Sequence, residues 1–322
     1  MKNLTKMLAM AAAVSSMQFA KAEEKVFAPT DRDGAEIDRI ELVNGQLLVR
    51  APNAQIDGVK TPYVYVGTNT DHFAVSGFAQ GGLTNVATYT HAGNGKIIMT
   101  EVPNTKAPSS DIYTTQVSSS PALNGVLSGI TKVESDTKSG SSDLSSVMQA
   151  SIKEGYLTKM FNGELYRVNG DSMDYLIKYD AANKKWDENN SLLSAPNNKQ
   201  IVDFVITPNY NNTGVNTYIV YDNGDGTKKS HTNVDNTISP INDKSVVSIA
   251  LADDQETVIL TNGGISLYKG RNGKPINNQG VQTKLNQLNT QLGKNSVKSA
   301  VIAGDIMYYA TAKKLGWIRI YE

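Results

Sequence analysis

The sequence predicts an all-β fold that is built from short antiparallel hairpins. Asn-Gly, the dipeptide that favours tight hairpin turns, occurs eight times in the 322-residue chain. Apolar, strand-like segments start near Tyr156, Ile201, Val246 and Val297, at a spacing of about 45 to 50 residues. Few segments have the periodicity of an amphipathic helix. Short strands at regular spacing, with turn residues between them, indicate a sandwich, a barrel or a propeller.

The first 22 residues have the parts of a secretory signal peptide in the usual order. Lys2 and Lys6 form a positive start, residues 7–20 are mostly apolar, and Ala20-Lys21-Ala22 is a cleavage site of the A-x-A type. An amphipathic N-terminal helix is the alternative interpretation. No later segment reaches the roughly 20 apolar residues of a membrane helix. We therefore expect a signal peptide at 1–22 and one exported domain at 23–322, in the periplasm or outside the cell.

Charge and cysteine content exclude several classes of protein. The full chain has 31 basic and 31 acidic side chains and no cysteine. The predicted signal peptide carries Lys2, Lys6 and Lys21, so the mature chain has 28 basic groups and a net charge of −3. A mildly acidic protein is not expected to bind nucleic acid. Without cysteine there is no disulfide framework, thiolate metal site or cysteine nucleophile.

The Asn-Gly pairs divide the chain into hairpins. Both central residues of a type I′ turn need a positive φ, which Asn and Gly adopt most easily. The segments 40–43 and 47–49 flank one pair, and 157–161 and 165–168 flank another. The eight pairs begin at Asn44, Asn94, Asn124, Asn162, Asn169, Asn223, Asn262 and Asn272.

Helical periodicity is confined to two segments. Val281, Leu285, Leu288 and Leu292 share one face and predict a short amphipathic insertion helix near 281–292, packed on the β-body. A partner-binding helix is the alternative. The apolar residues between 144 and 152 are compatible with a second short helix. Residues 106–146 are rich in Ser and Thr, and we expect a surface excursion or a hinge there.

Repeated units of strands predict a six- or seven-bladed β-propeller. The last unit has strands at 297–303, 306–311 and 317–321, with a turn predicted at 313–316. Earlier units have strands at 246–251, 257–261 and 265–268, at 201–206 and 217–221, and at 164–168 and 175–180. The spacing of the units is that of four-stranded propeller blades. An early strand near 25–27 is expected to pair with the last unit and close the ring, which would remove exposed sheet edges.

Two segments carry a resemblance to known propeller families. Residues 246–268 resemble a blade of the WD-repeat and lactonase-like propellers, with an apolar strand, an acidic turn, a second strand and a Gly turn. Residues 165–186 resemble the second half of a Kelch repeat, although not every unit has the paired glycines of that motif. The resemblance covers 156–321 and, more loosely, 36–102. It implies a propeller and no particular subfamily.

Motifs that carry chemistry are almost absent from the sequence. His72 and His91, with Asp71, are the nearest approach to a metal or catalytic group, and His231 is isolated. The turns at 31–34 and 222–226 resemble calcium loops, but their twelfth positions are Leu42 and Asn233 rather than Glu, so we interpret both as tight turns. Trp186 and Trp317 are suited either to stacking on sugars or to packing. We therefore predict no catalytic residue, cofactor or metal ligand.

Three functions fit these observations. The first is an exported, non-catalytic binding or scaffold propeller of the bacterial envelope, acting as a monomer on a protein or glycan partner. The second is a propeller enzyme or glycan-binding protein whose site is assembled from several blades. The third is an outer-membrane β-barrel, which the short, unevenly spaced strands and the non-aromatic C-terminal Glu322 do not favour.

Overall fold

The computed structural model describes most of the C-terminal half of the chain and parts of the N-terminal half. Residues 23–26, 36–43, 46–51, the strands of 55–132 given below, 144–154 and 156–321 are described, with gaps at 170–172, 235–239 and 294–295. The predicted signal peptide lies outside these residues. The Asn-Gly turns at Asn44, Asn94 and Asn124 also lie outside them.

The described strands of the N-terminal half form antiparallel sheets of neighbouring strands. The first sheet has the order β2 (Arg39–Val43), β3 (Gln46–Arg50), β6 (Tyr63–Gly67) and β7 (Val75–Phe78). A separate hairpin joins β4 (Gln55–Ile56) and β5 (Val59–Lys60). The second sheet has β8 (Val86–His91), β9 (Lys96–Glu101), β10 (Ile112–Gln116) and β11 (Thr131–Lys132).

The C-terminal half continues the same pattern. The third sheet contains β12 (Thr158–Phe161), β13 (Glu164–Asn169), β14 (Tyr175–Asp180), β15 (Lys185–Trp186) and β16 (Leu193–Ser194), and a short 3-10 helix follows at Pro196–Asn198. The fourth contains β17 (Ile201–Pro208), β18 (Val215–Asp222) and β19 (Lys228–Thr232). The fifth contains β20 (Ser248–Leu251), β21 (Thr257–Thr261) and β22 (Ile265–Lys269). The last contains β23 (Val297–Ala303), β24 (Ile306–Thr311), β25 (Lys314–Arg319) and β1 (Glu23–Val26).

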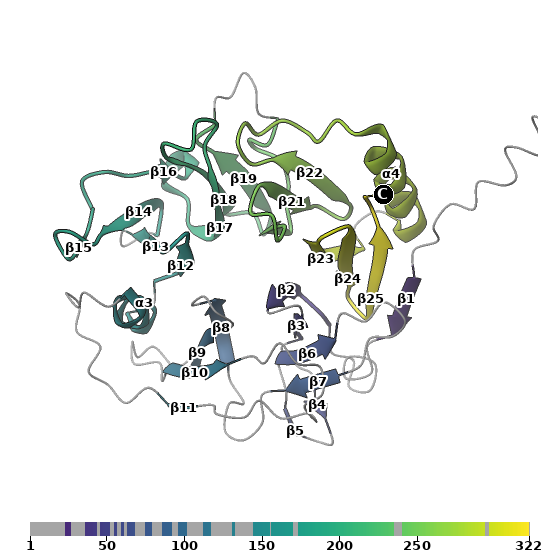
Figure 1. The fold of residues 1–322 in the computed structure, drawn as a ribbon, viewed down its shortest axis with the longest axis horizontal. Coiled ribbons are helices and arrows are strands. Elements are labelled where there is room, and N and C mark those ends of the chain that lie inside the picture. Colours follow the sequence, from purple (N-terminus) through teal and green to yellow (C-terminus); the bar gives the residue numbers. More distant parts are fainter. Residues whose placement is uncertain are drawn as a thin grey trace, which may run out of the picture.

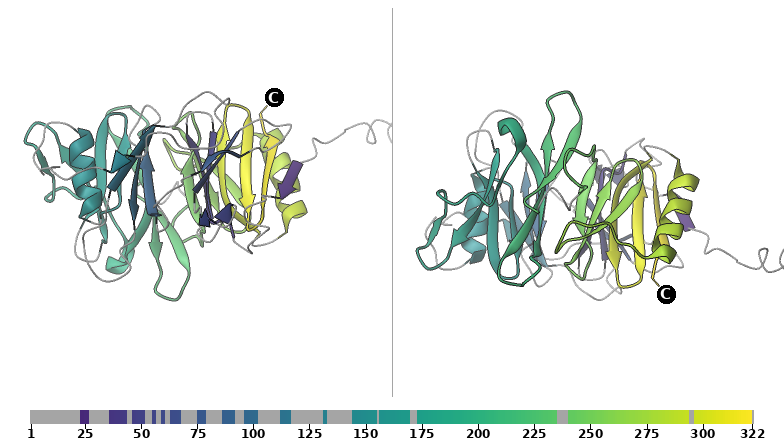
Figure 2. Two further views of the ribbon diagram at one scale, coloured as in Figure 1. Left: turned by 90° about the horizontal axis from the view of Figure 1, so that it is seen from below. Right: turned by 90° about the horizontal axis from the view of Figure 1, so that it is seen from above.

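The sheets follow one another in chain order around a common centre, and β23 of the last sheet lies beside β2 of the first (Figure 1). Viewed edge-on, the molecule is a thick disc whose sheets stand side by side (Figure 2). A radial series of antiparallel sheets is the architecture of a β-propeller. The fold is therefore all-β and propeller-like, as the spacing of the strands predicted.

The core consists of apolar clusters between neighbouring sheets. One cluster joins the first and last sheets through Leu47, Val49, Val301 and Leu315. Others join the third to the fourth sheet, the fourth to the fifth, and the fifth to the last. The fourth, fifth and last sheets have an apolar cluster on each of their two faces. Burial on both faces explains the nearly continuous apolar sequences of their strands.

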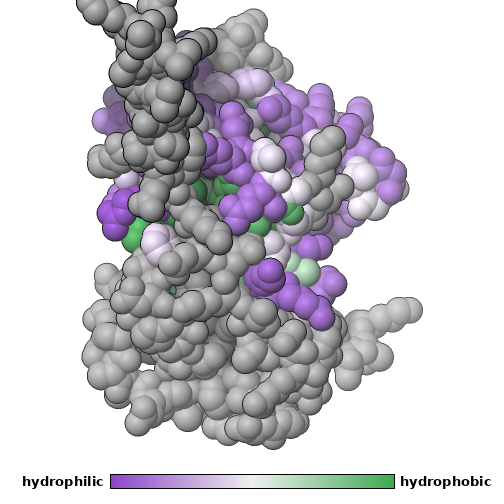
Figure 3. All heavy atoms as spheres, turned by 90° about the vertical axis from the view of Figure 1, so that its right-hand side faces the viewer, coloured by the Kyte–Doolittle hydropathy of each residue, from purple (hydrophilic) through white to green (hydrophobic). Residues whose placement is uncertain are grey.

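Two α-helices pack on the outside of the described sheets. α4 (Gln279–Leu292) buries Val281, Leu285 and Leu288 against the fifth and last sheets, which confirms the predicted insertion helix. Asn278 caps its N-terminus by accepting a hydrogen bond from the N–H of Val281. The described surface on this side of the molecule is mainly hydrophilic (Figure 3).

α3 (Leu144–Lys153) packs on the third sheet through Val147, Met148 and Ile152. α3 confirms the second short helix that the apolar residues between 144 and 152 allowed, although the fold-class prediction counted only the insertion helix. β10 and β11 also lie within the 106–146 segment, where the sequence suggested an excursion. β10 is rich in Thr, so its apolar pattern is weak.

The turns and the strand bounds agree with the predictions from the sequence except at two places: the φ angles of three Asn-Gly pairs and the start of β25. Asn162 and Gly163 both have a positive φ, as a type I′ turn requires, but at the pairs beginning at Asn223, Asn262 and Asn272 only the Gly does. β25 starts at Lys314, inside the segment that was predicted to be a turn. Gly316, which the sequence predicts in this turn, lies in β25 opposite Tyr309. The residue is glycine because the Tyr309 ring covers it and leaves no room for a Cβ.

The three-stranded sheets have their outer edges covered by other parts of the chain. The segment after β19 covers that strand, because the N–H of Ser230 donates to the Lys244 carbonyl and the N–H of Val246 donates to the Lys228 carbonyl. The side chain of Asn289 in α4 covers β22. Its Oδ1 accepts from the N–H of Ile265 at 2.9 Å and its Nδ2 donates to the Ile265 carbonyl at 3.1 Å. One amide side chain thus makes the two hydrogen bonds that a fourth strand would make there.

Candidate functional site: the central channel

One edge strand of each of the six larger sheets borders the common centre of the sheets (Figure 1). Side chains of β2, β12, β17, β20 and β23 line a cavity of about 440 Å³ there. β8 is the corresponding edge strand of the second sheet, and its side chains are not among those described. Because one strand from each of five sheets contributes to the wall, the cavity depends on how the sheets are arranged rather than on any single hairpin.

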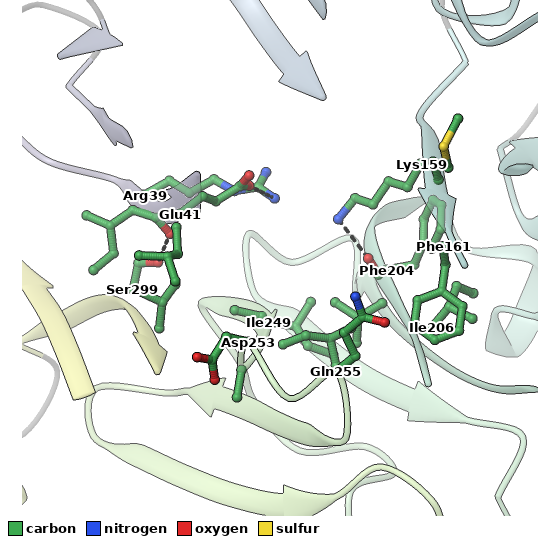
Figure 4. A pocket seen from close by; sticks show the side chains of 18 of the residues that line it. Arg39, Glu41, Lys159, Phe161, Phe204, Ile206, Ile249, Asp253, Gln255 and Ser299 are labelled. Atoms are coloured by element: carbon green, nitrogen blue, oxygen red, sulfur yellow. Dashed lines mark hydrogen bonds and ion pairs between the residues drawn. The ribbon is translucent and has the colours of Figure 1, made fainter. Parts of the chain in front are cut away.

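The wall of the channel is partly apolar and partly charged. Ile206, Ile249, Leu251 and Val301 form apolar surface. Along β2, Arg39 and Glu41 project into the channel while Ile40 between them is buried in the inter-sheet cluster. This alternation follows from the two-residue period of a strand. Arg39 and Lys159 extend toward one another from opposite sides of the cavity (Figure 4).

The Asp203 carboxylate connects these two cations. Lys159 Nζ donates to Asp203 Oδ1 at 2.6 Å and to the Phe204 carbonyl at 2.7 Å. Arg39 Nη2 lies 3.4 Å from Asp203 Oδ2 and 2.5 Å from Glu41 Oε1. The four side chains are only 13–25% exposed. At such burial the attraction between charges is stronger than it is on the surface. The network therefore ties together β2, β12 and β17, which belong to three different sheets.

β-bulges near the start of the inner strands position the polar residues. β17 has a register shift between Ile201 and Asp203, and β23 has one between Val297 and Ser299. A bulge inserts one extra residue and changes the direction of the side chains after it. Asp203 thereby reaches Lys159, and Ser299 Oγ donates to the Ile40 carbonyl at 3.2 Å. The same kind of shift is present in β8, between Val86 and Thr88.

Two further carboxylates make contacts at or next to the channel: Asp253 lines it, and Asp38 pairs with Arg50, which lines it. Asp253, in the turn after β20, accepts a hydrogen bond from the N–H of Gly304 at 2.7 Å and so connects the fifth and last sheets. Asp38 pairs with Arg50 at 3.0 Å. Burial raises the pKa of Asp38, while the charges of Arg50 and Arg39 act in the opposite direction. These contacts hold the polar groups of the wall in fixed positions, as a preorganised binding site requires.

Of the residues that the sequence singled out, none that the structure describes lines this channel. The side chains of Asp71, His72 and His91 and the turn at 31–34 lie outside the described residues. His231 in β19 is half-buried, burial lowers its pKa, and its Nδ1 has no hydrogen-bond partner among the described residues. Within the described part of the chain, no three His, Asp or Glu side chains are grouped so that they could hold a metal ion.

The 222–226 turn uses its carboxylates for its own hydrogen bonds. Asp222 accepts from the N–H of Gly224 at 2.8 Å, and Asp225 accepts from the N–H of Thr227 at 2.9 Å. The Thr227 hydroxyl and N–H lower the pKa of Asp225 to about 2. Lys199 donates to the carbonyl of Asn223. These contacts agree with a tight Asx-type turn, the interpretation favoured by the sequence.

Both tryptophans pack against protein groups. Trp317 packs at the edge of the cluster between the first and last sheets. Trp186 contacts Tyr179 edge-on, at 5.3 Å between ring centroids. The channel residues Arg39, Lys159 and Asp203 were not singled out from the sequence. The available signal was a charged residue in the middle of an apolar leading strand, as in Ile201-Val-Asp-Phe204.

The chain was compared with known proteins at three levels. No family model matches the sequence, and no curated protein matches it. Among solved structures, the β-propeller domain of Myceliophteria thermophila Cps50 (Swd1) aligns with a TM-score of 0.44 and 10% identity, over 89% of this chain and 97% of that one. The computationally designed Ika8 protein aligns with a TM-score of 0.42 and 8% identity, over 88% and 96%.

These similarities are too low to carry an argument about function. The assignment of the fold rests on the sheet topology of the chain itself. No helix in the described part of the chain has the length and apolar character needed to cross a membrane.

Proposed function

We propose that the chain is an exported, non-catalytic binding propeller of the bacterial envelope or the extracellular space, and that its partner, a protein or a glycan, engages the central channel. The observation that carries this proposal is the meeting of Arg39, Lys159 and Asp203, from three sheets, beside a cavity with apolar walls. The volume of this cavity lies in the range of small-ligand sites, about 300–1,000 Å³. A few fixed polar groups in an apolar wall are the usual composition of such sites.

The architecture that we infer for this function is a closed ring of six blades. The described residues contain six sheets of three or more strands. β1 pairs with β25 in the last sheet, with Glu23 opposite Trp317 and Val26 opposite Lys314. This pairing of an early strand with the last sheet, which the sequence predicted, supports closure because it joins the two ends of the chain in one blade. Closure would hold the channel wall rigid without disulfides.

Ligand capture with matched variants tests the binding function. Wild-type protein starting at Glu23 and the variants Lys159→Gln and Lys178→Gln are immobilised and exposed to envelope extract and to a glycan array. Lys178 is the control because its partner, Glu164, is exposed and distant from the channel lining. We expect a ligand that wild type and Lys178→Gln retain and Lys159→Gln loses. The absence of any retained ligand, or equal retention by all three proteins, would overturn the proposal.

Export is tested separately. In a bacterial host we expect the protein outside the cytoplasm with Glu23 as its first residue. A cytoplasmic protein that keeps Met1 would contradict the predicted signal peptide.

A second function is favoured by the same convergence of side chains. A site to which five sheets contribute could also serve a propeller enzyme or a glycan-binding protein, whose residues come one from each blade. A hydrolase panel together with the glycan array distinguishes this alternative. Turnover that Lys159→Gln abolishes would favour an enzyme over a binding protein.

A further inference from the structure

A second cavity lies on the outside of the third sheet, away from the channel. It has a volume of about 490 Å³, and α3, β13, β14 and the segment that contains β15 enclose it. Its lining carries three cations and two carboxylates, from Arg167, Lys184, Lys185, Glu154 and Glu188. None of these residues lines the channel, so this cavity is independent of the function proposed above.

Arg167 of β13 is the buried cation of this cavity. Its side chain is 6% exposed. The guanidinium lies between two aromatic rings, with Cζ 4.1 Å from the centroid of Tyr156 and 4.4 Å from that of Trp186. Nη2 donates to Asn169 Oδ1 at 2.9 Å, and Asn169 Nδ2 in turn donates to the Tyr175 hydroxyl at 2.8 Å. The faces of the guanidinium are thus covered, and its edge is the part left for a polar partner.

No carboxylate among the described residues forms a hydrogen bond with this buried charge. Glu154 Oε2 is 3.6 Å from Nη1 and Glu188 Oε1 is 3.6 Å from Nη2, beyond hydrogen-bond distance. Both carboxylates are more than half exposed, at 52% and 62%, so water weakens their attraction. The Nε atom is buried and has no hydrogen-bond partner among the described residues. A buried N–H of a charged group that lacks a partner is costly to the folded state.

We propose that this cavity binds a carboxylate group, which Arg167 holds through its Nε edge and which Lys184 and Lys185 attract to the cavity. A carboxylate is a planar acceptor that matches the edge of a guanidinium. Its hydrogen bond to Nε would be charge-assisted and would satisfy the donor that neither Glu reaches. The lysines offset the repulsion from Glu154 and Glu188. The desolvation that lowers the pKa of Arg167 is relieved by such a partner.

The carboxylate comes from a small organic acid or from a peptide, and the two sources share the same chemistry at Arg167.

The fluorescence of Trp186 reports the binding of either source, because its ring lies on the guanidinium of Arg167. The chain has two tryptophans, so in a Trp317→Phe background the protein fluorescence comes from Trp186 alone. The probes are sodium acetate, sodium succinate, and N-acetyl-trialanine as the free acid and as the amide. Sodium chloride at matched ionic strength is the reference titration.

We expect a saturable change in Trp186 fluorescence with the carboxylates and none with chloride or the amide. A response to acetate or succinate identifies a small acid as the source, and a response to the peptide acid alone identifies a peptide. Arg167→Lys keeps the charge but lacks the Nε edge, and it should bind at least about ten-fold more weakly. The control Arg319→Lys, in an exposed pair with Asp305, should bind as wild type does.

The double variant Lys184→Gln/Lys185→Gln keeps the inference testable if Arg167→Lys fails to fold. It should bind several-fold more weakly than wild type, because only the attraction at the rim is reduced. The proposal is overturned if every carboxylate behaves as chloride does, or if folded Arg167→Lys binds as tightly as wild type.

Discussion

Arg39 of the first sheet and Asp203 of the fourth sheet are far apart in the sequence, yet their side chains lie 3.4 Å apart beside the central channel. Lys159 of the third sheet holds the other oxygen of the same carboxylate at 2.6 Å. Asp203, in the fourth sheet, thus forms ion pairs with cations of the first and third sheets. It is therefore the position at which a substitution should affect the ring as a whole.

Asp203→Asn should destabilise the protein by about 1–3 kcal/mol, because it leaves Lys159 half-buried without its carboxylate and removes one partner of Arg39. The measurement is the free energy of unfolding from urea titrations. The control is Asp305→Asn, which breaks the exposed pair with Arg319 and should change stability by no more than about 1 kcal/mol. Equal losses in the two variants would show that the channel network does not stabilise the ring.

Gly270→Ala should destabilise the contact between the fourth and fifth sheets. A Cβ at this position would lie 2.5 Å from Thr207 Cγ2 and 2.7 Å from the Glu256 carbonyl oxygen. The Gly270 carbonyl accepts hydrogen bonds from the Tyr218 and Thr207 hydroxyls, at 2.6 and 2.9 Å, so displacing it would also weaken these bonds. We expect a loss of about 1–3 kcal/mol in urea unfolding.

The matched variant for this test is Gly280→Ala in the first turn of α4. The nearest atom to a Cβ there is Asn278 Oδ1, at 3.4 Å, an ordinary contact. Because Ala favours the helix over Gly, this variant should be neutral or more stable by up to about 1 kcal/mol. Destabilisation of both variants to the same extent would contradict the steric explanation.

Asn289→Ala should expose the outer edge of β22. The substitution leaves the N–H and carbonyl of Ile265 without the amide that satisfies both of them. We expect a loss of about 1–3 kcal/mol and faster amide exchange at Ile265. Asn286→Ala, on the exposed face of the same helix, should not destabilise the protein. Unchanged protection of Ile265 in Asn289→Ala would disprove the proposed role of this side chain.

His231 should make stability depend on pH in the weakly acidic range. Burial lowers its pKa below the ordinary value of 6.5, so the unfolded chain binds a proton at a higher pH than the folded one. The contribution of neutral His231 to the free energy of unfolding is therefore complete above pH 6.5. It is lost as the pH falls from 6.5 through the lower pKa of His231 in the folded protein. Compared with His231→Gln, the wild type should lose stability as the pH falls below about 6.5. Parallel stability curves for the two proteins would rule this out.

Much of the framework could be predicted from local sequence, while the candidate site could not. β14 and β21 were predicted with their observed bounds, because apolar segments end at polar or glycine turns on both sides. α4 was predicted because its apolar residues repeat with a helical period. Such signals lie within a few residues of one another, so they do not depend on the arrangement of distant segments.

The charged network depends on contacts between sheets and on a bulge. Asp203 reaches Lys159 because β17 has an extra residue at Val202, and the local sequence carries no pattern that locates this bulge. In the sequence, Arg167 is likewise an ordinary charged residue of a strand; its burial comes from α3 and the segment that contains β15, which fold over it. The charged network of the channel joins residues that are remote in sequence, and the second cavity forms where α3 and the segment that contains β15 fold over β13.

The pairing of β1 with β25 has a topological consequence. Glu23 lies opposite Trp317, so the predicted start of the mature chain and the end of β25, at residues 317–319, lie in the same sheet. A short flexible linker could therefore join the two ends, and new ends could be opened in a surface turn between two sheets. Such a circular permutant should fold with the same sheets, which circular dichroism and urea unfolding would verify. The order of the blades along the polypeptide would change while their order in space would not.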